Sequence, residues 1–89
     1  MKISIIVSDK MVVIDGEGFE IDDMSFIDPS AHAVQWEDTK GFVEFVEDES
    51  GIKPLNSVIT DFSPYQPAVD GWQAKKDEWE KMFITSTVV

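Results

Sequence analysis

The chain has no cysteine, no arginine and a single histidine among its 89 residues. Without cysteine there is no disulfide, no thiolate nucleophile and no cysteine-ligated zinc site. The apolar runs fall well short of the roughly 18–20 residues that span a bilayer, and the N-terminus lacks the basic and apolar regions of a signal peptide. We therefore expect a mature chain that is made in a cytoplasm and has no membrane-spanning segment.

Positive charge is also scarce, because 7 lysines face 18 acidic residues and leave a net charge of −11. Residues 9–50 hold thirteen of the acids against two lysines, whereas the rest of the chain sums to zero. This balance argues against direct binding to nucleic acid or anionic lipid, both of which attract clusters of lysine and arginine. The acids predict a solvated strand-and-turn surface. The alternative is a concentrated negative face that mimics nucleic acid or receives a basic partner.

Motifs for catalysis and ligand binding are incomplete. His32 has no Gly-x-Ser-x-Gly elbow to work with, so a hydrolytic triad is not predicted. Aligning Gly16 with the glycine of an EF-hand loop puts the apolar Val13 at a ligand position, and Gly16 with Gly18 lacks the third glycine of a dinucleotide fingerprint. Three loop aspartates remain as ion ligands, with a solvated loop as the simpler interpretation: Asp22, Asp23 and Asp28. We predict no catalytic residue, no metal site and no cofactor.

Short β-branched runs between turn residues predict five strands. They cover residues 2–8, 11–14, 19–21, 31–36 and 42–47. Asp15-Gly16 is the strongest turn signal, because glycine accepts the positive φ of a tight hairpin, and residues 38–41 supply another turn. In the strand 31–36, Val34 and Trp36 share one face. Residues 55–62 fit either a short strand or a turn of helix.

A helix is predicted over residues 64–83. Ser63 can cap its free amides, and Pro64 fits the first helical position. Apolar residues then recur at helical spacing: Tyr65, Ala68, Val69, Trp72, Trp79, Met82 and Phe83. The final residues, 84–89, have strand character and are expected as a tail that frays or pairs with the sheet.

These elements predict an α+β fold: a small antiparallel β-meander of four to five strands with one C-terminal amphipathic helix packed on it. We expect a single domain over 1–89, β-rich over 1–62, helical over about 64–83 and ending in the tail 84–89. The predicted core is Ile5, Val7, Val13, Val34, Trp36, Phe45, Val69, Trp72 and Trp79.

Three tryptophans in so short a chain allow two interpretations. Trp72 and Trp79 lie about two helical turns apart, so they share a helical face. The simpler interpretation is that this face packs on the sheet as core. Otherwise one tryptophan is partly exposed and anchors a protein partner, since tryptophan is favoured at binding hot spots. The candidate partner-binding residues are Trp72, Trp79 and Tyr65.

Three segments stand out as motifs. They are Ile14-Asp15-Gly16, the run 31–36 (AHAVQW) followed by 41–44 (GFVE), and the run 65–72 (YQPAVDGW). In these segments the chain resembles small bacteriophage proteins encoded in the tail and tail-fibre gene region. It departs from the pattern at Gly71, where a helix former is expected, and in its acidic middle. The resemblance implies a β-strand core and a helix start, and it places no catalytic residue on this chain.

We therefore expect a non-enzymatic phage accessory or virion protein that acts by protein–protein contact in tail or tail-fibre assembly, in the host bacterial cytoplasm or in the virion. The expected partner is a tail or fibre component or a basic host protein, and a homo-oligomer stays open. The alternative function is an acidic nucleic-acid mimic that inhibits a host DNA-binding protein. A small hydrolase or metal-dependent enzyme is a third hypothesis, which the missing catalytic constellations disfavour.

Overall fold

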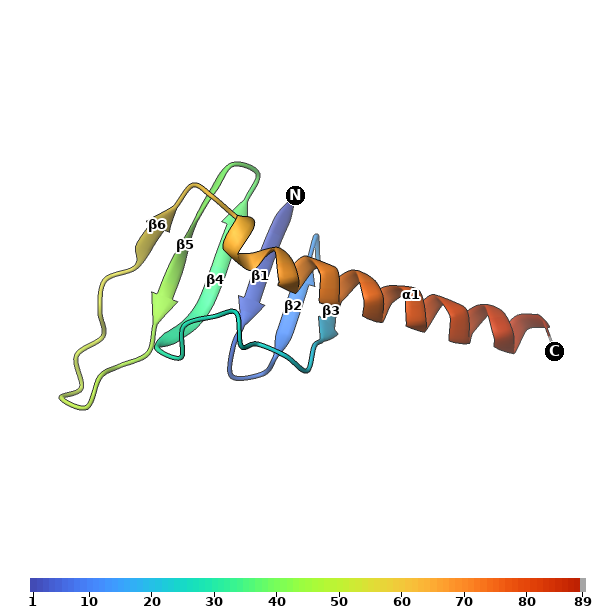
Figure 1. Ribbon diagram of the computed structural model, residues 1–89, viewed down its shortest axis with the longest axis horizontal. Helices are drawn as coiled ribbons and strands as arrows, with labels where there is room; N and C mark the ends of the chain where they lie inside the picture. Colours follow the sequence, from blue (N-terminus) through green and yellow to red (C-terminus); the bar gives the residue numbers. More distant parts are fainter. Residues whose placement is uncertain (89) are drawn as a thin grey trace.

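The computed structural model describes residues 1–88 as a six-stranded antiparallel sheet with one C-terminal helix (Figure 1). The elements are β1 (Lys2–Ile6), β2 (Met11–Ile14), β3 (Glu17–Glu20), β4 (Ala31–Glu37), β5 (Lys40–Phe45), β6 (Ser57–Ile59), the 3₁₀ turn η1 (Ser63–Tyr65) and α1 (Gln66–Val88). The strand order is β3-β2-β1-β4-β5-β6, so two three-stranded meanders meet at the β1–β4 pair. The predicted α+β class, a sheet with a single C-terminal helix packed on it, is confirmed.

Strand β6 comes from the segment that the sequence left open between strand and helix. Its residues pair with β5, with Val58 opposite Phe42 and Ile59 opposite Gly41. Ile59 packs against the core cluster from there. Adding this β-branched pair to the sheet therefore partly buries one side chain and brings the strand count to six, above the expected four or five.

Two hairpins follow the turn chemistry of the sequence. Asp15 and Gly16 have φ values of 49° and 86°, which a two-residue hairpin loop requires, and they join β2 to β3 as predicted. The Asp15 carboxylate also accepts a hydrogen bond of 2.8 Å from the backbone amide of Lys2. In the β4–β5 turn Asp38 has φ 56°, a conformation that aspartate tolerates better than most residues. That turn is shorter than predicted, because β5 already begins at Lys40.

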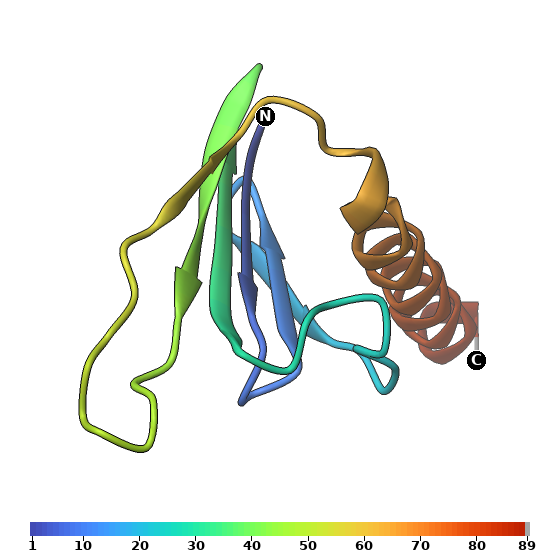
Figure 2. The same ribbon diagram turned by 60° about the vertical axis from the view of Figure 1, so that its left-hand side comes forward.

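The sheet has one covered face and one open face. Figure 2 shows helix α1 and the loop between β3 and β4 on the same side of the sheet. The buried core lies on that side: Ile3, Ile5, Val12, Ile14, Ile21, Ile27, Ala31, Val34, Val43, Ala68 and Trp72. Val34 and Trp36 share the covered face of the sheet, because they pair with the core residues Ile5 and Ile3. Their predicted position on one face is therefore confirmed. We call the opposite side the outer face.

Most of the predicted core is found on the covered side. Ile5, Val34 and Trp72 are buried, while Val7, Trp36, Phe45 and Val69 are partly buried against them. The prediction for Val13 is wrong, because it lies opposite Ser4 on the outer face and its neighbour Val12 is buried instead. The run Met11–Ile14 has no polar residue to set the alternation, so the sequence did not determine which valine faces inward. The prediction for Trp79 is also wrong, since 52% of its surface is exposed.

Helix α1 begins and ends later than predicted. Ser63–Tyr65 form the 3₁₀ turn, and the α-helix starts at Gln66, with Pro67 in its first turn where no amide is needed. Residues 84–88, predicted as a tail with strand character, continue the helix to Val88. A β-branched residue costs only roughly half a kcal/mol in a helix, so strand-favouring residues do not stop one that is already formed. Val89 lies outside the described residues.

The helix is longer than the sheet is wide. The Cα radius of gyration is 15.2 Å and the longest dimension is 57 Å, whereas a compact chain of this length has a radius near 12 Å (about 2.2·N^0.38). In Figure 1 the helix crosses the half of the sheet formed by β1 to β3 and continues beyond β3. We call its last part, residues 79–88, the projecting segment.

Candidate partner-binding surface

Trp72 fastens α1 to the sheet. Its side chain is buried, with 7% of its surface exposed, and its indole Nε1 donates a hydrogen bond of 2.8 Å to the backbone carbonyl of Glu17. Its ring meets Phe19 edge-on, with centroids 5.7 Å apart. Trp72 is thus a core residue, and in this conformation its side chain is covered against a partner.

Gly71 lies where α1 passes close to Ile21. A Cβ at this position would lie 3.2 Å from the Cγ2 atom of Ile21, which is closer than ordinary packing. A larger residue at Gly71 would require the buried Ile21 side chain or the helix to shift by a few tenths of an ångström. Glycine costs the helix roughly 1 kcal/mol relative to alanine, and in return it permits this close approach.

Two lysines hold α1 to the β3 side of the sheet. Lys76 Nζ lies 3.1 Å from a carboxylate oxygen of Glu17 and 5.0 Å from the centroid of the Trp72 ring. Lys75 Nζ lies 3.8 Å from a carboxylate oxygen of Asp22. Such exposed pairs contribute little energy one by one. The Trp72 hydrogen bond fixes the rotation of the helix where it crosses the β3 edge, and both lysine pairs lie on the same side.

The projecting segment presents two large apolar side chains next to this anchor. Trp79 touches Phe19, with ring centroids 6.4 Å apart, yet 52% of its surface is exposed. Met82 follows one turn later and is 67% exposed. The stripe that packs on the sheet at Ala68 and Trp72 therefore continues past the sheet as an accessible apolar surface, which marks interaction sites in folded proteins.

Tyr65, the third candidate, lies at the other end of the helix. It is partly buried in the 3₁₀ turn and packs on Phe62 with ring centroids 6.0 Å apart. Phe62 in turn packs on Trp36 at 5.3 Å. The structure therefore brings Trp72 and Trp79 together around Phe19, whereas Tyr65 belongs to a separate aromatic cluster.

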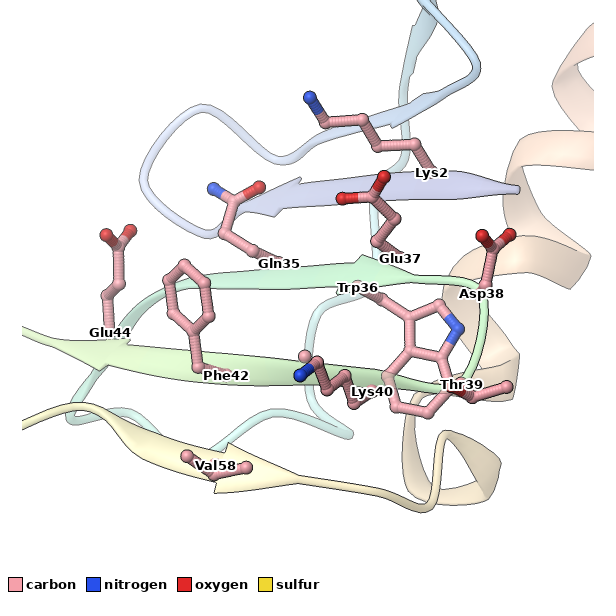
Figure 3. A pocket seen from close by; sticks show the side chains of 11 residues that line it. Lys2, Gln35, Trp36, Glu37, Asp38, Thr39, Lys40, Phe42, Glu44 and Val58 are labelled. Atoms are coloured by element: carbon pink, nitrogen blue, oxygen red, sulfur yellow. The ribbon is translucent and has the colours of Figure 1, made fainter.

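An open hollow of about 840 Å³ lies on the outer face over β4 and β5 (Figure 3). Phe42 and Val58 form its apolar floor on neighbouring strands. Lys2 lies opposite Glu37, and Glu37 lies opposite Lys40, so the charges alternate across three strands and largely compensate. The lining charges therefore favour neither an anionic nor a cationic ligand, and they single out no catalytic group.

The acidic residues are divided between both ends of the sheet. Because every strand pair is antiparallel, the connections 7–10, 21–30 and 46–56 meet at one end and the turns 15–16, 38–39 and 60–62 at the other. The first end carries Asp9, Asp22, Asp23, Asp28, Glu47, Asp48 and Glu49, and the second carries Asp15, Asp38 and Asp61. The charge is therefore not gathered on a single face.

Four of these aspartates organise their own loops through an Asp-x-Ser pattern that the sequence analysis did not use. Asp28 accepts hydrogen bonds from the hydroxyl and the amide of Ser30, and Asp48 accepts the same pair from Ser50. Asp23 with Ser25 and Asp61 with Ser63 repeat the motif. These side chains close Asx turns, so their first role is loop structure.

The Asx turns give a testable pH dependence. Hydrogen bonds from the Ser50 hydroxyl, and then from the Ile52 and Ser50 amides, lower the pKa of Asp48 below its ordinary 3.8. A lowered folded-state pKa means that the carboxylate stabilises the turn above pH 3.8 and that this contribution is lost as pH falls through the lower value. We expect Ser50→Ala to raise the pKa of Asp48 toward 3.8 in a carboxyl ¹³C NMR titration. The pKa of Asp28 should stay low in the same variant, and a parallel shift there would contradict a local cause.

His32 lies on β4 where the pairing register shifts between Ala31 and Ala33, and its side chain is exposed. Within residues 1–88, no three histidine, aspartate or glutamate side chains gather closely enough to hold a metal ion. The loop aspartates Asp22, Asp23 and Asp28 therefore form no such group. Asp23 and Asp28 accept hydrogen bonds from serines of their own loops.

Comparison with protein-family models, with curated proteins and with solved structures finds no match for this chain. No helix within residues 1–88 is long and apolar enough to cross a membrane.

Proposed function

We propose that this protein acts without catalysis of its own, by protein–protein contact through the projecting segment of α1. The observation that carries the proposal is the half-exposed Trp79 beside the exposed Met82, on a helix whose position is fixed by Trp72. A rigid tryptophan with an accessible ring loses little conformational entropy when it binds, which is why such residues anchor interfaces. The partner should offer an apolar groove that receives one helical face.

The resemblance to phage proteins supplies the proposed setting. We place the protein among accessory or virion proteins of a bacteriophage, with a tail or tail-fibre component as the partner, in the host cytoplasm or the particle. A helix that projects beyond its own domain suits an assembly factor, because it can enter a groove of a larger protein while the sheet stays outside. The motifs that carry the resemblance fall on β4 and β5, on the β2–β3 turn and on the start of α1, where Trp72 anchors the helix to the sheet.

Affinity capture tests this proposal. The tagged full-length chain is incubated with lysate of phage-infected host cells at roughly 0.05 M and 0.3 M salt, which differ severalfold in screening strength. We expect a tail or fibre component to be retained at both concentrations. Trp79→Ala should weaken that binding at least about tenfold, as truncation of a hot-spot tryptophan does. Glu80→Ala, an exposed neighbour on the same helix, is the matched control and should bind as the wild type does.

The acidic mimic is the competing outcome of the same capture. Seven acids at one end of the sheet favour it, whereas the acids at the other end and on the outer face do not form part of one nucleic-acid-like surface. A host DNA-binding protein that is captured at low salt, released at 0.3 M and indifferent to Trp79→Ala would replace the proposed function with the mimic.

A further inference from the structure

The two edges of the sheet are built differently. On the β3 edge, Glu17 and Glu20 place charges along the strand, and the carbonyl of Glu17 is occupied by the Trp72 indole. Helix α1 also passes beside this edge in Figure 1. Charged side chains and a covering element are two of the means by which an edge strand is protected from pairing with another chain.

The β6 edge has neither kind of protection. Residues 54–60 (PLNSVIT) contain no charged side chain, in a chain whose net charge is −11. Val58 is 75% exposed and Leu55 is 92% exposed. Val58 also lies opposite Phe42, itself 36% exposed, so the apolar surface continues onto the outer face. An edge strand presents backbone N–H and C=O groups in one row, and here those groups are flanked by apolar side chains.

We propose that β6 pairs with β6 of a second copy of the chain, in antiparallel orientation, to form a twelve-stranded sheet across a two-fold axis. The charge distribution favours a second copy of the chain as the partner of β6. The ten residues 51–60 carry one lysine and no acid, so this stretch lets two strongly acidic chains meet without direct repulsion. A basic partner would instead be drawn to the acidic loops at the ends of the sheet.

Charge also selects the antiparallel orientation. The loop 46–56, with Glu47, Asp48 and Glu49, enters β6 at one end of the sheet. Antiparallel pairing puts the two copies of this loop at opposite ends of the combined sheet, each toward the end of the other copy that carries Asp38, Lys40 and Asp61. Parallel pairing would put six acids side by side. A two-fold interface of this kind closes after two copies, so it yields a dimer and not a fibre.

Sedimentation velocity over a concentration series of the full-length chain tests the pairing. Because β6 has three residues, the interface is small and the dimer is expected to dissociate on dilution. Raising salt from about 0.02 M to 0.5 M screens the repulsion between the acidic chains, so the dimer should strengthen with salt. Val58→Lys, which puts a charge on each side of the two-fold axis at an exposed position, should weaken dimerisation at least tenfold. Val58→Thr keeps the β-branched shape and should dimerise within about twofold of the wild type.

Met82→Lys makes the same change of charge on the projecting segment. Met82→Lys should leave dimerisation intact and abolish binding of the partner proposed above. Val58→Lys should weaken dimerisation and leave binding of that partner intact. The dimer proposal can therefore fail while the proposed function stands. A chain that stays monomeric at every concentration and salt would overturn the pairing, as would a dimer that is indifferent to Val58→Lys. If monomeric chains instead bound an extended strand of a different protein at the β6 edge, the proposal that a second copy pairs there would be overturned.

Discussion

Trp72→Ala is expected to lower the free energy of unfolding by about 4 kcal/mol, in the range measured when a large buried aromatic is truncated. The variant removes a side chain that is 7% exposed, its edge-on contact with Phe19 and its hydrogen bond to the Glu17 carbonyl. A domain of this size has a free energy of unfolding of roughly 5 to 10 kcal/mol, so the variant would lose about 40 to 80% of its stability. Urea denaturation followed by circular dichroism at 222 nm measures the change.

Two further variants show whether the loss of stability is specific to Trp72 or follows from the loss of any indole side chain. Trp72→Phe keeps an aromatic ring in the core and loses the hydrogen bond to Glu17, so it should cost about 1–2 kcal/mol. Trp79→Ala removes a side chain that is half exposed and should cost less than about 1.5 kcal/mol. Equal losses for Trp72→Ala and Trp79→Ala would contradict the division of roles between the two tryptophans.

Gly41→Ala is the second substitution with a large expected effect. A Cβ at this position in β5 would overlap the carbonyl oxygen of Gln35 and lie 2.9 Å from the Gln35 carbonyl carbon and from Trp36 Cα. These atoms belong to the backbone of the paired strand β4, so no side-chain rotation relieves the overlap and the hairpin itself must shift. We expect a loss of about 3 kcal/mol or more in the free energy of unfolding, at the upper end of the cost of overpacking.

Gly18→Ala is the matched control for Gly41→Ala. Its Cβ would approach Met11 Sδ and Val13 Cγ2, each at 3.3 Å, and both are ends of side chains that can move by a few tenths of an ångström. Thermal unfolding of the two variants should therefore differ clearly, with Gly18→Ala within about 1 kcal/mol of the wild type. If Gly41→Ala lowered the free energy of unfolding no more than Gly18→Ala does, the close approach of the β4 backbone to Gly41 would be wrong.

The sequence predicted those parts of the fold that depend on local chemistry. The Asp15-Gly16 turn, the hairpin of β4 and β5 and the inward face of Val34 and Trp36 follow from positive-φ residues and from period-two alternation. It failed where neighbouring residues are chemically alike. Val12 and Val13 cannot be distinguished by hydrophobicity, and only the register with β1 shows that Val12 faces the core.

The candidate surface required tertiary information that no local pattern contains. Trp72 and Trp79 share one helical stripe, and the stripe alone predicts the same environment for both. What separates them is the width of the sheet beneath the helix: α1 reaches the β3 edge near Trp72, so Trp79 lies at the margin. The Asx turns are the opposite case. Their Asp-x-Ser signal was present four times in the sequence and would have assigned part of the negative charge to loop structure.

Contact through the projecting segment can be observed by ¹H–¹⁵N NMR of the labelled chain with the captured partner. The three tryptophans give three separate indole signals, two of which serve as internal controls. We expect the Trp79 indole and the amides of residues 76–82 to shift or broaden on binding. The Trp72 indole, held by the Glu17 carbonyl, and the Trp36 indole should stay in place. Perturbation confined to the acidic loops 21–30 and 46–56, with an unchanged Trp79 signal, would contradict binding through the projecting segment.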